Sequence, residues 1–331
     1  MMKKMMKNNS LSEIREALVA ADSVLIFPHI FMDGDTFGSS VALCLALREK
    51  GKTAFVLIED PIPGYLKFLE DGLCTYDIDI IKEPDLCVAI DSSDPERFVK
   101  RREKFFAGKK TLNIDHHKTS KLFADYNYVD PGAAATGEII YDLLIEMGMA
   151  PDKKQYEAIY AAIVTDTGSF QYTNTTMKSH QVTVELLRHG IDSGFVNRML
   201  YQNTRLQKLN VSGRILGTIK TFAGGEAVIA YLTKEMLSEA EALMEDAEGV
   251  TEILRSISGV ELAIFAKEFK ADKTRISMRS KSWADTAELS LKYGGGGHSR
   301  AGGCTINEPI FTAIEMIEAD VTEYFEKNQK K

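Results

Sequence analysis

The chain has 331 residues, of which 44% are hydrophobic and 27% are charged. This length and composition predict a globular protein of roughly two domains, on a prior of about 150 residues per domain. No apolar run approaches the ~20 residues that cross a bilayer, and the start is amphipathic, so we expect neither a membrane partner nor a secretion signal. The net charge of −8 argues against long duplex nucleic acid as a partner, because such binding neutralises many phosphates.

The four cysteines, Cys44, Cys74, Cys87 and Cys304, are scattered and form no Cys-x-x-Cys pair. Cys44 and Cys87 lie in apolar segments, where a free cysteine behaves as a small hydrophobe. We therefore predict a reduced, cytoplasmic protein rather than one held by disulfides.

The N-terminal part alternates helical patterns with short apolar strands. A capping box, Ser10-Leu11-Ser12-Glu13, predicts the start of the first helix. Apolar segments then predict strands over residues 24–27, 53–58, 85–90 and 110–114, separated by helices over 38–51, 65–70 and 95–106. This alternation is typical of a parallel sheet that is covered on both faces. Ligands bind such sheets beyond the carboxyl ends of the strands, where Pro28-His29, Asp91 and Asp115-His116-His117 fall.

The remaining elements predict a second domain. Helical patterns cover residues 136–147, 153–164, 176–189 and 192–202, and the polar tract 203–211 is interpreted as a connector. Strands are then predicted over 225–233, 260–269, 274–281 and 301–306, with helices over 283–293 and from Pro309. We expect an α/β protein with a first domain over 1–190, a connector over 191–212 and a smaller α/β domain over 213–331.

The loop after the first strand carries three groups that bind metals. His29, Asp33 and Asp35 offer imidazole and carboxylate ligands, and Gly34 permits a tight turn that directs both carboxylates to one side. The alternative is a solvated Asp-Gly-Asp turn.

Two further acids, Asp91 and Asp166, each follow an apolar segment directly. An acid in that position either serves a site or belongs to a cap or turn. Asp94-Pro95 is the better candidate for the cap after Asp91, whereas an Asx-turn remains the alternative for Asp166.

The adjacent histidines of Asp115-His116-His117 are a rarer feature. At a strand end, one imidazole can bind a metal and leave the other for the substrate. Asp115 can orient an imidazole through a hydrogen bond, as carboxylates often do for ligating histidines. His180 and His189 lie on a predicted helix face, and we interpret them as structural or exposed.

These clusters match the demands of two-metal phosphoester cleavage. Such chemistry uses two ions about 3.5–4 Å apart, which activate water and screen the charge on the leaving oxygen. Ligation by oxygen and nitrogen without thiolate suits Mn²⁺ best, with Co²⁺, Fe²⁺ or Mg²⁺ as alternatives.

In this order, the motifs resemble those of the DHH phosphoesterase superfamily, whose title motif is Asp115-His116-His117 here. The run Gly294-Gly295-Gly296-Gly297-His298 resembles the subgroup with a C-terminal DHH-associated domain. Within it, the chain is most similar to the stand-alone bacterial nano-RNases, which are oligoribonucleases, and more distantly to RecJ. The resemblance covers residues 10–325 and implies a catalytic and a substrate-binding domain, with the active site in the cleft between them.

The resemblance also implies residue roles. One metal would lie on His29, Asp33 and Asp91, and the second on Asp35, Asp91, His116 and Asp166, so that Asp91 bridges the two. His117 would contact the scissile phosphate as hydrogen-bond donor or general acid, with Asp115 behind it.

The loop after the first strand departs from the family. Met32 stands where members often have proline, and Phe31 and Phe37 are larger than the resemblance implies. None of these is a ligand position, so the departure concerns the shape of the loop.

Consecutive glycines followed by a histidine suggest a ligand site in the second domain. Such a backbone comes close to a ligand and offers N–H groups to an anion; the alternative is a flexible linker. Arg279, on a predicted strand, resembles the family's phosphate-clamping arginine, and a guanidinium fork suits that task. The predicted substrate-binding residues are Arg279, Ser280, Gly295, Gly296, Gly297, His298 and Arg300.

The leading interpretation is a Mn²⁺-dependent phosphodiesterase that hydrolyses RNA of about two to five nucleotides to mononucleotides, an expectation by family analogy. The resemblance adds phosphatase action on 3′-phosphoadenosine 5′-phosphate and, as an alternative, hydrolysis of cyclic di-AMP or its linear product pApA. A second alternative is a nucleotide-binding sensor without turnover, which the complete ligand set disfavours. Inorganic pyrophosphatase activity is disfavoured by the glycine-rich motif. The family also implies a homodimer.

Overall fold

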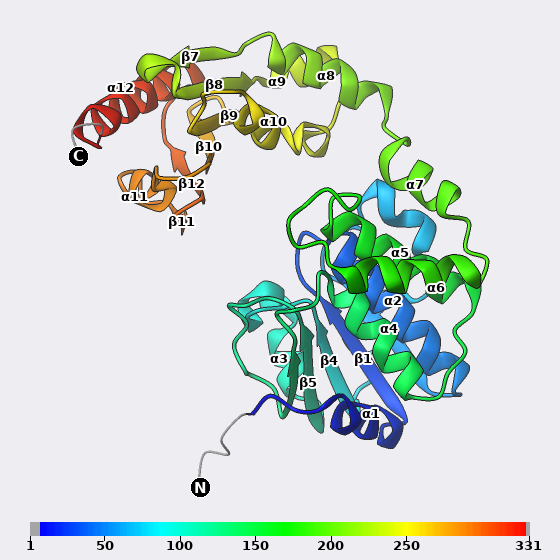
Figure 1. Cartoon of the computed structure of the whole chain (residues 1–331). Coiled ribbons are helices and arrows are strands. Elements are labelled where there is room, and N and C mark those ends of the chain that lie inside the picture. The colour runs from blue at the N-terminus through cyan, green and yellow to red at the C-terminus, as the bar shows by residue number, and fades with distance from the viewer. Residues whose placement is uncertain (1–6, 329–331) are drawn as a thin grey trace, which may run out of the picture. The chain divides into compact units, whose positions relative to one another are not determined.

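The first part of the chain is built on six strands: Ser23–Pro28 (β1), Thr53–Leu57 (β2), Cys74–Thr75 (β3), Leu86–Ile90 (β4), Lys110–Asp115 (β5) and Tyr126–Val129 (β6). In this computed structural model, which describes residues 7–328, they form one sheet in the order β3-β2-β1-β4-β5-β6 (Figure 1). Every neighbouring pair is parallel. The predicted parallel sheet is confirmed, and the two short edge strands are additions to it.

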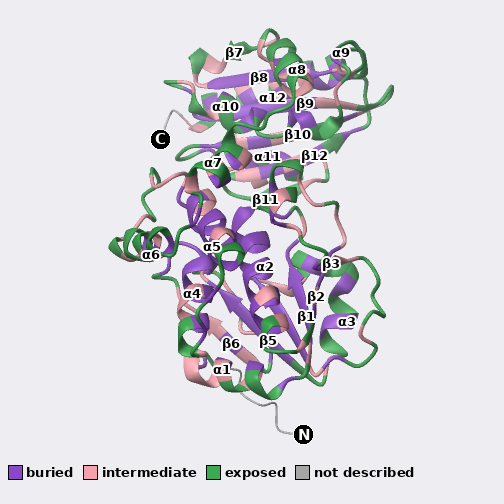
Figure 2. Cartoon of the chain, turned by 90° about the vertical axis from the view of Figure 1, so that its right-hand side faces the viewer, coloured by how far each residue is buried: buried purple, intermediate pink, exposed green. Residues whose placement is uncertain are grey.

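Helices cover both faces of this sheet, which explains why its central strands are apolar throughout. Val24 and Ile26 of β1 pack in the core that includes α1, α2, α4 and α5, whereas Leu25 and Phe27 pack on the other face with the aromatic core of η2 and α3 (Figure 2). The helices of the first unit are Leu11–Ala20 (α1), Gly34–Glu49 (α2), Gly64–Leu69 (η1), Pro95–Arg101 (η2), Arg102–Phe106 (α3), Thr136–Glu146 (α4), Lys153–Asp166 (α5), Met177–Arg188 (α6) and Ser193–Tyr201 (α7).

The predicted helix over residues 95–106 is interrupted. Phe98 has φ −142° and ψ 48°, which is not helical, and breaks the regular geometry within the 3₁₀-helix η2, before α3 begins at Arg102. Its ring is fully buried against Phe27, Phe105 and Phe123. Burial of this aromatic ring therefore overrides the helical pattern.

Residues before α1 cover the edge of β6. The Asn8 amide donates to the Val129 carbonyl (2.9 Å) and accepts from its N–H (2.8 Å). The Asn9 N–H donates to the Asn127 carbonyl (2.6 Å), and the Asn9 side chain accepts from the Asn127 N–H (3.0 Å). The predicted capping box at Ser10 and Glu13 is confirmed.

The chain divides into two units between Asn203 and Thr204. The second unit contains a mixed sheet in the order β11-β12-β10-β9-β8-β7, in which only β8 and β9 are parallel. Its strands are Lys220–Phe222 (β7), Ala227–Leu232 (β8), Leu262–Lys270 (β9), Lys273–Ser280 (β10), Gly296–His298 (β11) and Ala301–Ile306 (β12). The predicted α/β class of this part is confirmed.

Helices cover this sheet as well. One core contains side chains of Leu206–Leu216 (α8), Val250–Ser256 (α10) and, at its margin, Lys234–Glu239 (α9), and the other those of Thr286–Leu291 (α11) and Ile310–Asn328 (α12). The tract predicted as a polar connector is mostly helical: α7 precedes Asn203, and α8 buries Val211 and Ile215 in the second unit. Two buried residues per helix face were too weak a pattern to predict α8.

The flexible-linker alternative for the glycine run is wrong for residues 296–298, which form β11, a strand that the sequence did not predict, and pair with β12. No helix within residues 7–328 is long and apolar enough to span a membrane. The four cysteines are free thiols.

Candidate metal centre

The start of α2 places the first acids of the site. Asp33 is the N-cap, and its carboxylate accepts the Thr36 N–H at 3.0 Å. The predicted tight turn at Gly34 is therefore wrong, because Gly34 is the first residue of the helix. A Cβ on Gly34 would lie 2.3 Å from the Thr165 hydroxyl oxygen. Glycine thus lets α2 begin against the end of α5, which brings Asp35 towards Asp166.

Asp91 directly follows β4 in a left-handed backbone conformation, with φ 55°. Asp and Asn tolerate this conformation better than most residues do, and such strain concentrates at functional sites. The Asp91 N–H donates to the Ile114 carbonyl at 2.9 Å. The side chain is thereby fixed at the carboxyl end of the sheet, 3% exposed.

His29, Asp33 and Asp91 form a first group of metal-ligand atoms, all within 4.8 Å of one another. The His29 Nε2 lies 3.5 Å from an Asp33 oxygen and 3.5 Å from the Asp91 Oδ2. The His29 Nδ1 lies 2.7 Å from the Ile30 carbonyl oxygen, so we assign its proton to Nδ1. That assignment leaves the Nε2 lone pair directed at the two carboxylates.

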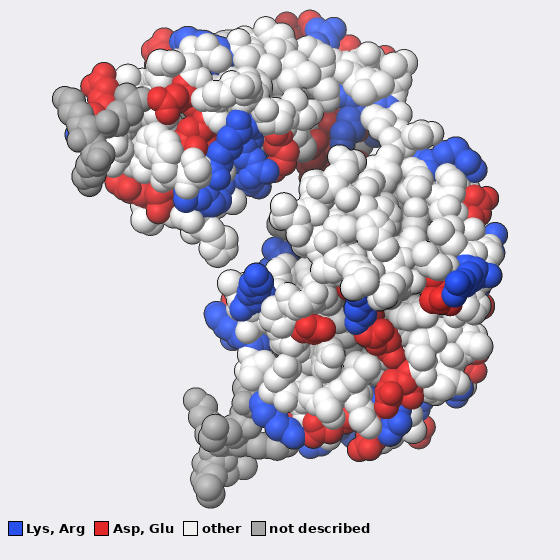
Figure 3. Space-filling model, viewed as in Figure 1, with Lys and Arg blue, Asp and Glu red and all other residues white. Residues whose placement is uncertain are grey.

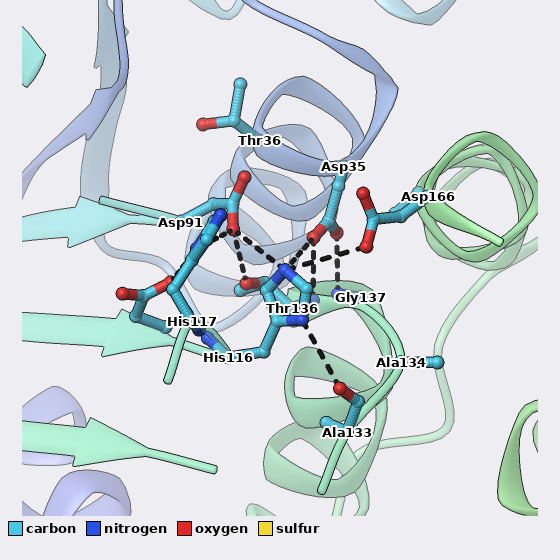
Figure 4. Close-up of polar contacts among 12 residues, drawn as sticks. Asp35, Thr36, Asp91, His116, His117, Ala133, Ala134, Thr136, Gly137 and Asp166 are labelled. Carbon is cyan, nitrogen blue, oxygen red and sulfur yellow. Dashed lines mark hydrogen bonds and ion pairs between the residues drawn. The ribbon is translucent and has the colours of Figure 1, made fainter. Parts of the chain in front are cut away.

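Asp35, His116 and Asp166 form a second group (Figure 4). The His116 Nε2 lies 3.8 Å from Asp35 Oδ2 and 3.6 Å from Asp166 Oδ2. It also lies 3.5 Å from Asp91 Oδ1. Asp91 therefore presents one oxygen to each group, which is the arrangement that a bridging carboxylate requires.

The N-terminus of α4 holds two of these acids, a contact that sequence reasoning missed. The backbone N–H groups of Thr136 and Gly137 donate to the two oxygens of Asp35, at 2.7 and 2.9 Å (Figure 4). The Thr136 hydroxyl donates to Asp91 Oδ1 at 3.0 Å. A Cβ on Gly137 would lie 2.6 Å from the Ala162 Cβ. The run of small residues before α4 was the available signal for this close packing.

Negative charge accumulates at the centre. Burial raises the pKa of Asp35 well above its usual range, and the charges of Asp91, Asp166 and Asp33 raise it further. Burial is also the main cause that raises the pKa of Asp166 to about 6, although His116 opposes the shift. Four carboxylates face two imidazoles, His29 and His116. A donor set of oxygen and nitrogen with excess negative charge fits divalent cations.

His117 lies beside this centre with a different environment. The buried Asp115 accepts the His117 Nδ1–H at 2.7 Å and the N–H groups of His116 (2.8 Å) and His117 (3.2 Å), all with Oδ1. The hydrogen bond to Asp115 is the main cause that raises the pKa of His117 to about 8. The His117 Nδ1 is also 3.5 Å from Asp91, but its proton is engaged by Asp115. Its Nε2 remains available to a substrate, because the side chain is 43% exposed.

The other two predicted structural histidines lie in aromatic contacts. His180 stacks on Phe170 with 5.0 Å between ring centroids, and His189 contacts Tyr156 at 4.7 Å. Neither belongs to a group of possible metal ligands among the described residues.

The predicted substrate-binding residues lie in the second unit, where their environments differ. Arg279 is half-buried on β10, with its Nε 3.3 Å from Glu252. Ser280 is 1% exposed, and its hydroxyl donates to the Ser299 carbonyl. Arg300 is exposed, and its guanidinium donates to the Ala284 carbonyl at 3.0 Å. Arg279 and Arg300 are thus accessible, whereas the Ser280 side chain is engaged inside the unit.

Packing explains two of the predicted glycines. A Cβ on Gly295 would lie 2.2 Å from the Gly303 carbonyl oxygen, and one on Gly297, at φ 140°, would lie 2.3 Å from the Ala301 carbonyl oxygen. Gly296 has open space around it, and His298 is exposed on β11. Gly294, Gly296, Gly297 and His298 are all exposed, but at Gly297 a Cβ would clash with the backbone, whereas at Gly294 and Gly296 it would meet open space.

A basic hollow of about 390 Å³ adjoins this run, and sequence reasoning missed its cations. It is lined by Lys267, Arg275, Gly294 and Gly295 among others, and Figure 3 shows basic side chains gathered near β9 and β10. Lys267 and Arg275 are directly opposite across these strands, where like charges destabilise a sheet. Burial lowers the pKa of Lys267, as do the charges of Arg275 and Arg279. An anion in the hollow would relieve this repulsion.

Comparison with known proteins agrees with this geometry. Residues 23–165 match the DHH family N-terminal domain, and residues 224–327 match the DHHA1 domain. A protein of Thermus thermophilus named bifunctional oligoribonuclease and PAP phosphatase NrnA is 30% identical over 88% of this chain and 87% of its own length. Its namesake in Bacillus subtilis is 30% identical over 89% of this chain and 93% of its own length.

Two further proteins extend the comparison. Cyclic-di-AMP phosphodiesterase PdeA of Listeria monocytogenes is 24% identical over 86% of this chain, which spans 45% of that protein. The crystal structure of an exopolyphosphatase-related protein from Bacteroides fragilis has the same fold, with a TM-score of 0.88, 24% identity and 100% coverage of both chains.

These matches and the acid-rich end of the parallel sheet identify a hydrolase of the phosphoesterase class. The chain belongs to the DHH family and carries both a DHH domain and a DHHA1 domain. The predicted family resemblance and enzyme class are confirmed.

Proposed function

We propose that the protein is a Mn²⁺-dependent phosphodiesterase of the cytoplasm that hydrolyses short oligoribonucleotides to mononucleotides. A second proposed activity is removal of a phosphate from 3′-phosphoadenosine 5′-phosphate. The observation that carries the proposal is the pair of ligand groups that share Asp91. Two relatives named for these activities, similar to this chain over most of their length, support it.

His29, Asp33 and Asp91 would hold one ion, and Asp35, Asp91, His116 and Asp166 the second. When bound, such ions polarise phosphoryl oxygens and lower the pKa of water. The absence of thiolate from the donor set favours Mn²⁺ over softer alternatives. Asp35 is already held by two backbone N–H groups of α4, which would fix its position for the second ion.

His117 supplies the proton or hydrogen bond that the scissile phosphate needs. Because its pKa is raised to about 8, most of its imidazole is protonated near neutral pH. Asp115 fixes the ring by accepting the Nδ1–H. The protonated Nε2 then donates to a phosphoryl or leaving oxygen, which is the role of a general acid.

Substrate recognition is assigned to the second domain. We place catalysis in residues 1–190 and recognition in residues 213–331, joined by residues 191–212. Arg279, Arg300 and His298 would contact the substrate's phosphate or base, and Arg279 is aided by the neighbouring cations Lys267 and Arg275.

The alternative substrate is cyclic di-AMP or pApA, which the similarity to PdeA supports. Initial rates with Mn²⁺ on an RNA pentamer, pApA, cyclic di-AMP and 3′-phosphoadenosine 5′-phosphate decide between the two. We expect both short RNA and pApA to be cleaved, with a higher kcat/KM on the RNA pentamer than on pApA; the reverse order would favour the alternative. A preference for cyclic di-AMP would establish the alternative, and no turnover of any substrate by metal-loaded protein would contradict the enzymatic function.

A second experiment tests the division between the domains. Arg279→Ala and His298→Ala should each raise KM about 10-fold, the effect of losing one charge-assisted hydrogen bond, while the content of bound Mn²⁺ is unchanged. Arg214→Ala, an exposed arginine of the same unit paired with Glu239, is the matched control. Loss of metal in Arg279→Ala would show that this residue supports the metal centre instead.

A further inference from the structure

Phe31 is an exposed aromatic residue in an unusual backbone conformation. Its side chain is 77% exposed, and its φ is 54°. Left-handed conformations are rare for bulky residues and are found mainly where the surrounding structure imposes them. Phe31 therefore combines an unfavourable backbone with an unburied ring, and neither feature stabilises the fold.

The loop around Phe31 is held firmly. The Phe31 N–H donates to Asp60 Oδ2 at 3.2 Å, and the Ile30 N–H donates to the Arg97 carbonyl at 2.7 Å. Met32, the next residue, is 4% exposed and packs in the main core of the unit. The loop is thus pinned on both sides of Phe31, so the ring is held in solvent by the fold.

The loop that holds Phe31 also carries two of the candidate metal ligands. Phe31 is two residues from both His29 and Asp33, and two residues span at most about 7 Å. Arg97 is bonded to this loop, because its carbonyl accepts the Ile30 N–H. Its charge also acts on Asp33: burial raises the pKa of Asp33, the hydrogen bond from His29 lowers it, and the charge of Arg97 adds to the lowering. Arg97 is exposed, and its guanidinium has no hydrogen bond or ion pair within residues 7–328.

We propose that Phe31 and Arg97 form a nucleotide subsite on the first unit, in which the Phe31 ring stacks on a nucleobase and Arg97 binds a phosphate. The inference rests on the proposed function and extends it to the residues that recognise the nucleotide beside the cleaved bond. An exposed ring on a pinned loop, with an exposed arginine whose backbone is bonded to the neighbouring Ile30, fits a flat base carrying a phosphate. Both contacts recur where proteins bind single-stranded nucleic acid.

The test compares three dinucleotides: pApA, and pApA made abasic at its first or its second nucleotide. Phe31→Ala removes the ring, Phe31→Tyr retains it, and Phe31→Gly removes it while relieving the left-handed backbone. Phe106→Ala, an exposed phenylalanine of α3 on the same unit at 47% exposure, is the matched control. For each variant, kcat/KM is measured with Mn²⁺ on all three substrates.

We expect Phe31→Ala and Phe31→Gly to lower kcat/KM on pApA about 10-fold, in line with the loss of one base–aromatic stack. In these two variants, the ratio of kcat/KM on pApA to kcat/KM on one of the two abasic substrates should fall by the same factor. The nucleotide that is abasic in that substrate carries the stacked base. Phe31→Tyr should preserve the ratio, and Phe31→Gly should melt no lower than wild type. Equal losses on all three substrates, or no loss on pApA, would overturn the stacking role.

Arg97→Gln should lower kcat/KM on all three substrates by a similar factor of about 10, because a phosphate contact does not depend on the base. Lys100→Gln, an exposed lysine of η2, is its control. Base-dependent losses in Arg97→Gln, or none, would overturn the assignment of Arg97.

The wild-type rate tests the proposed function separately from this subsite. If wild type cleaves none of the substrates, titration of pApA into wild type and Phe31→Ala still decides the subsite. A dissociation constant about 10-fold weaker in the variant supports it, and equal constants overturn it.

Discussion

Two buried carboxylates, one in each unit, have opposite environments. Asp35 is 1% exposed and accepts two backbone N–H groups, yet burial and the neighbouring acids raise its pKa. Glu261 is 5% exposed and accepts the N–H groups of Ser282, Trp283 and Ala284 together with the Ser282 hydroxyl. These hydrogen bonds overcome its burial and lower its pKa.

The difference separates a functional acid from a structural one. Donors surround Glu261, so its charge stabilises the segment that leads into α11. Acids surround Asp35, so its charge destabilises the apo first unit until cations bind. Buried charge is favourable only where partners compensate its desolvation. The same chemical group therefore serves stability in the second unit and ligand binding in the first.

The largest expected effect is on catalysis. Asp91→Asn should lower kcat on pApA by about 10³-fold or more, because the carboxylate proposed to bridge both ions is lost. Asparagine tolerates the left-handed backbone at this position, so the variant should fold. In chelator, its melting temperature should equal or exceed that of wild type, because one repelling charge is gone. A variant that loses activity by unfolding would contradict this contrast between the units.

Metal binding should stabilise the first unit selectively. At about 100 times the dissociation constant, Mn²⁺ should add roughly 2.7 kcal/mol to its free energy of unfolding. Hydrogen exchange on the whole chain, with Mn²⁺ or with chelator, measures this effect residue by residue. Protection should rise in β1, β4, β5 and α2 and stay constant in β9 and β10. If Mn²⁺ slowed hydrogen exchange equally in both units, the selective stabilisation of the first unit would be contradicted.

Glu261→Gln should destabilise the second unit by roughly 2 kcal/mol at neutral pH, since buried donors lose a charged acceptor. The pKa of Glu261 is lowered in the folded state, so its stabilisation is fully present above the unfolded pKa of about 4.3 and is lost as pH falls through the folded value. The difference between wild type and variant should therefore shrink only under acid conditions. Exchange of the amides of residues 282–284, followed against pH, measures it. A constant difference down to the lowest pH would contradict the assignment.

The smallest expected effect comes from removing the Thr136 hydroxyl, which holds the candidate metal ligand Asp91 in place. Thr136→Val keeps the shape of the side chain and removes the hydroxyl that donates to Asp91. Groups that orient metal ligands typically contribute about 10- to 100-fold in affinity or activity, and we expect the lower end because the backbone N–H groups still hold Asp35. Thr136→Ser should retain activity. Metal affinity by titration and kcat on pApA are the measurements, and a Thr136→Ser variant as impaired as Thr136→Val would refute the hydroxyl's role.

Much of the fold was predictable because it follows from local patterns. Apolar runs marked β1, β2, β4 and β5, and polar residues at their ends located Asp91 and His116 correctly at the carboxyl edge of the sheet. The start of α2 was predicted at Gly38 rather than Gly34, because Asp33 was considered as a metal ligand or part of a solvated turn and not as the N-cap that it also provides. The close packing of Gly34 against Thr165 could not be predicted, because no local pattern in the sequence indicates it.

Contacts distant in sequence were the main omissions. Thr136 and Gly137 reach Asp35 across about a hundred residues, and only the fold brings a helix N-terminus to that carboxylate. No sequence pattern singled out Lys267 and Arg275, because only the pairing of β9 with β10 shows that they lie opposite each other. Strand β11 was not predicted because its residues include consecutive glycines, which carry no alternating apolar pattern.

The asparagines before α1 bear on how the protein can be handled. Asn8 and Asn9 occupy the hydrogen-bonding groups along the open edge of β6, and an uncovered strand edge is a template for pairing with another chain. A truncation that removes them would expose the unpaired backbone groups of β6, so we expect the shortened protein to self-associate as its concentration rises. N-terminal truncations made for tagging or crystallisation should therefore retain residues 8 and 9.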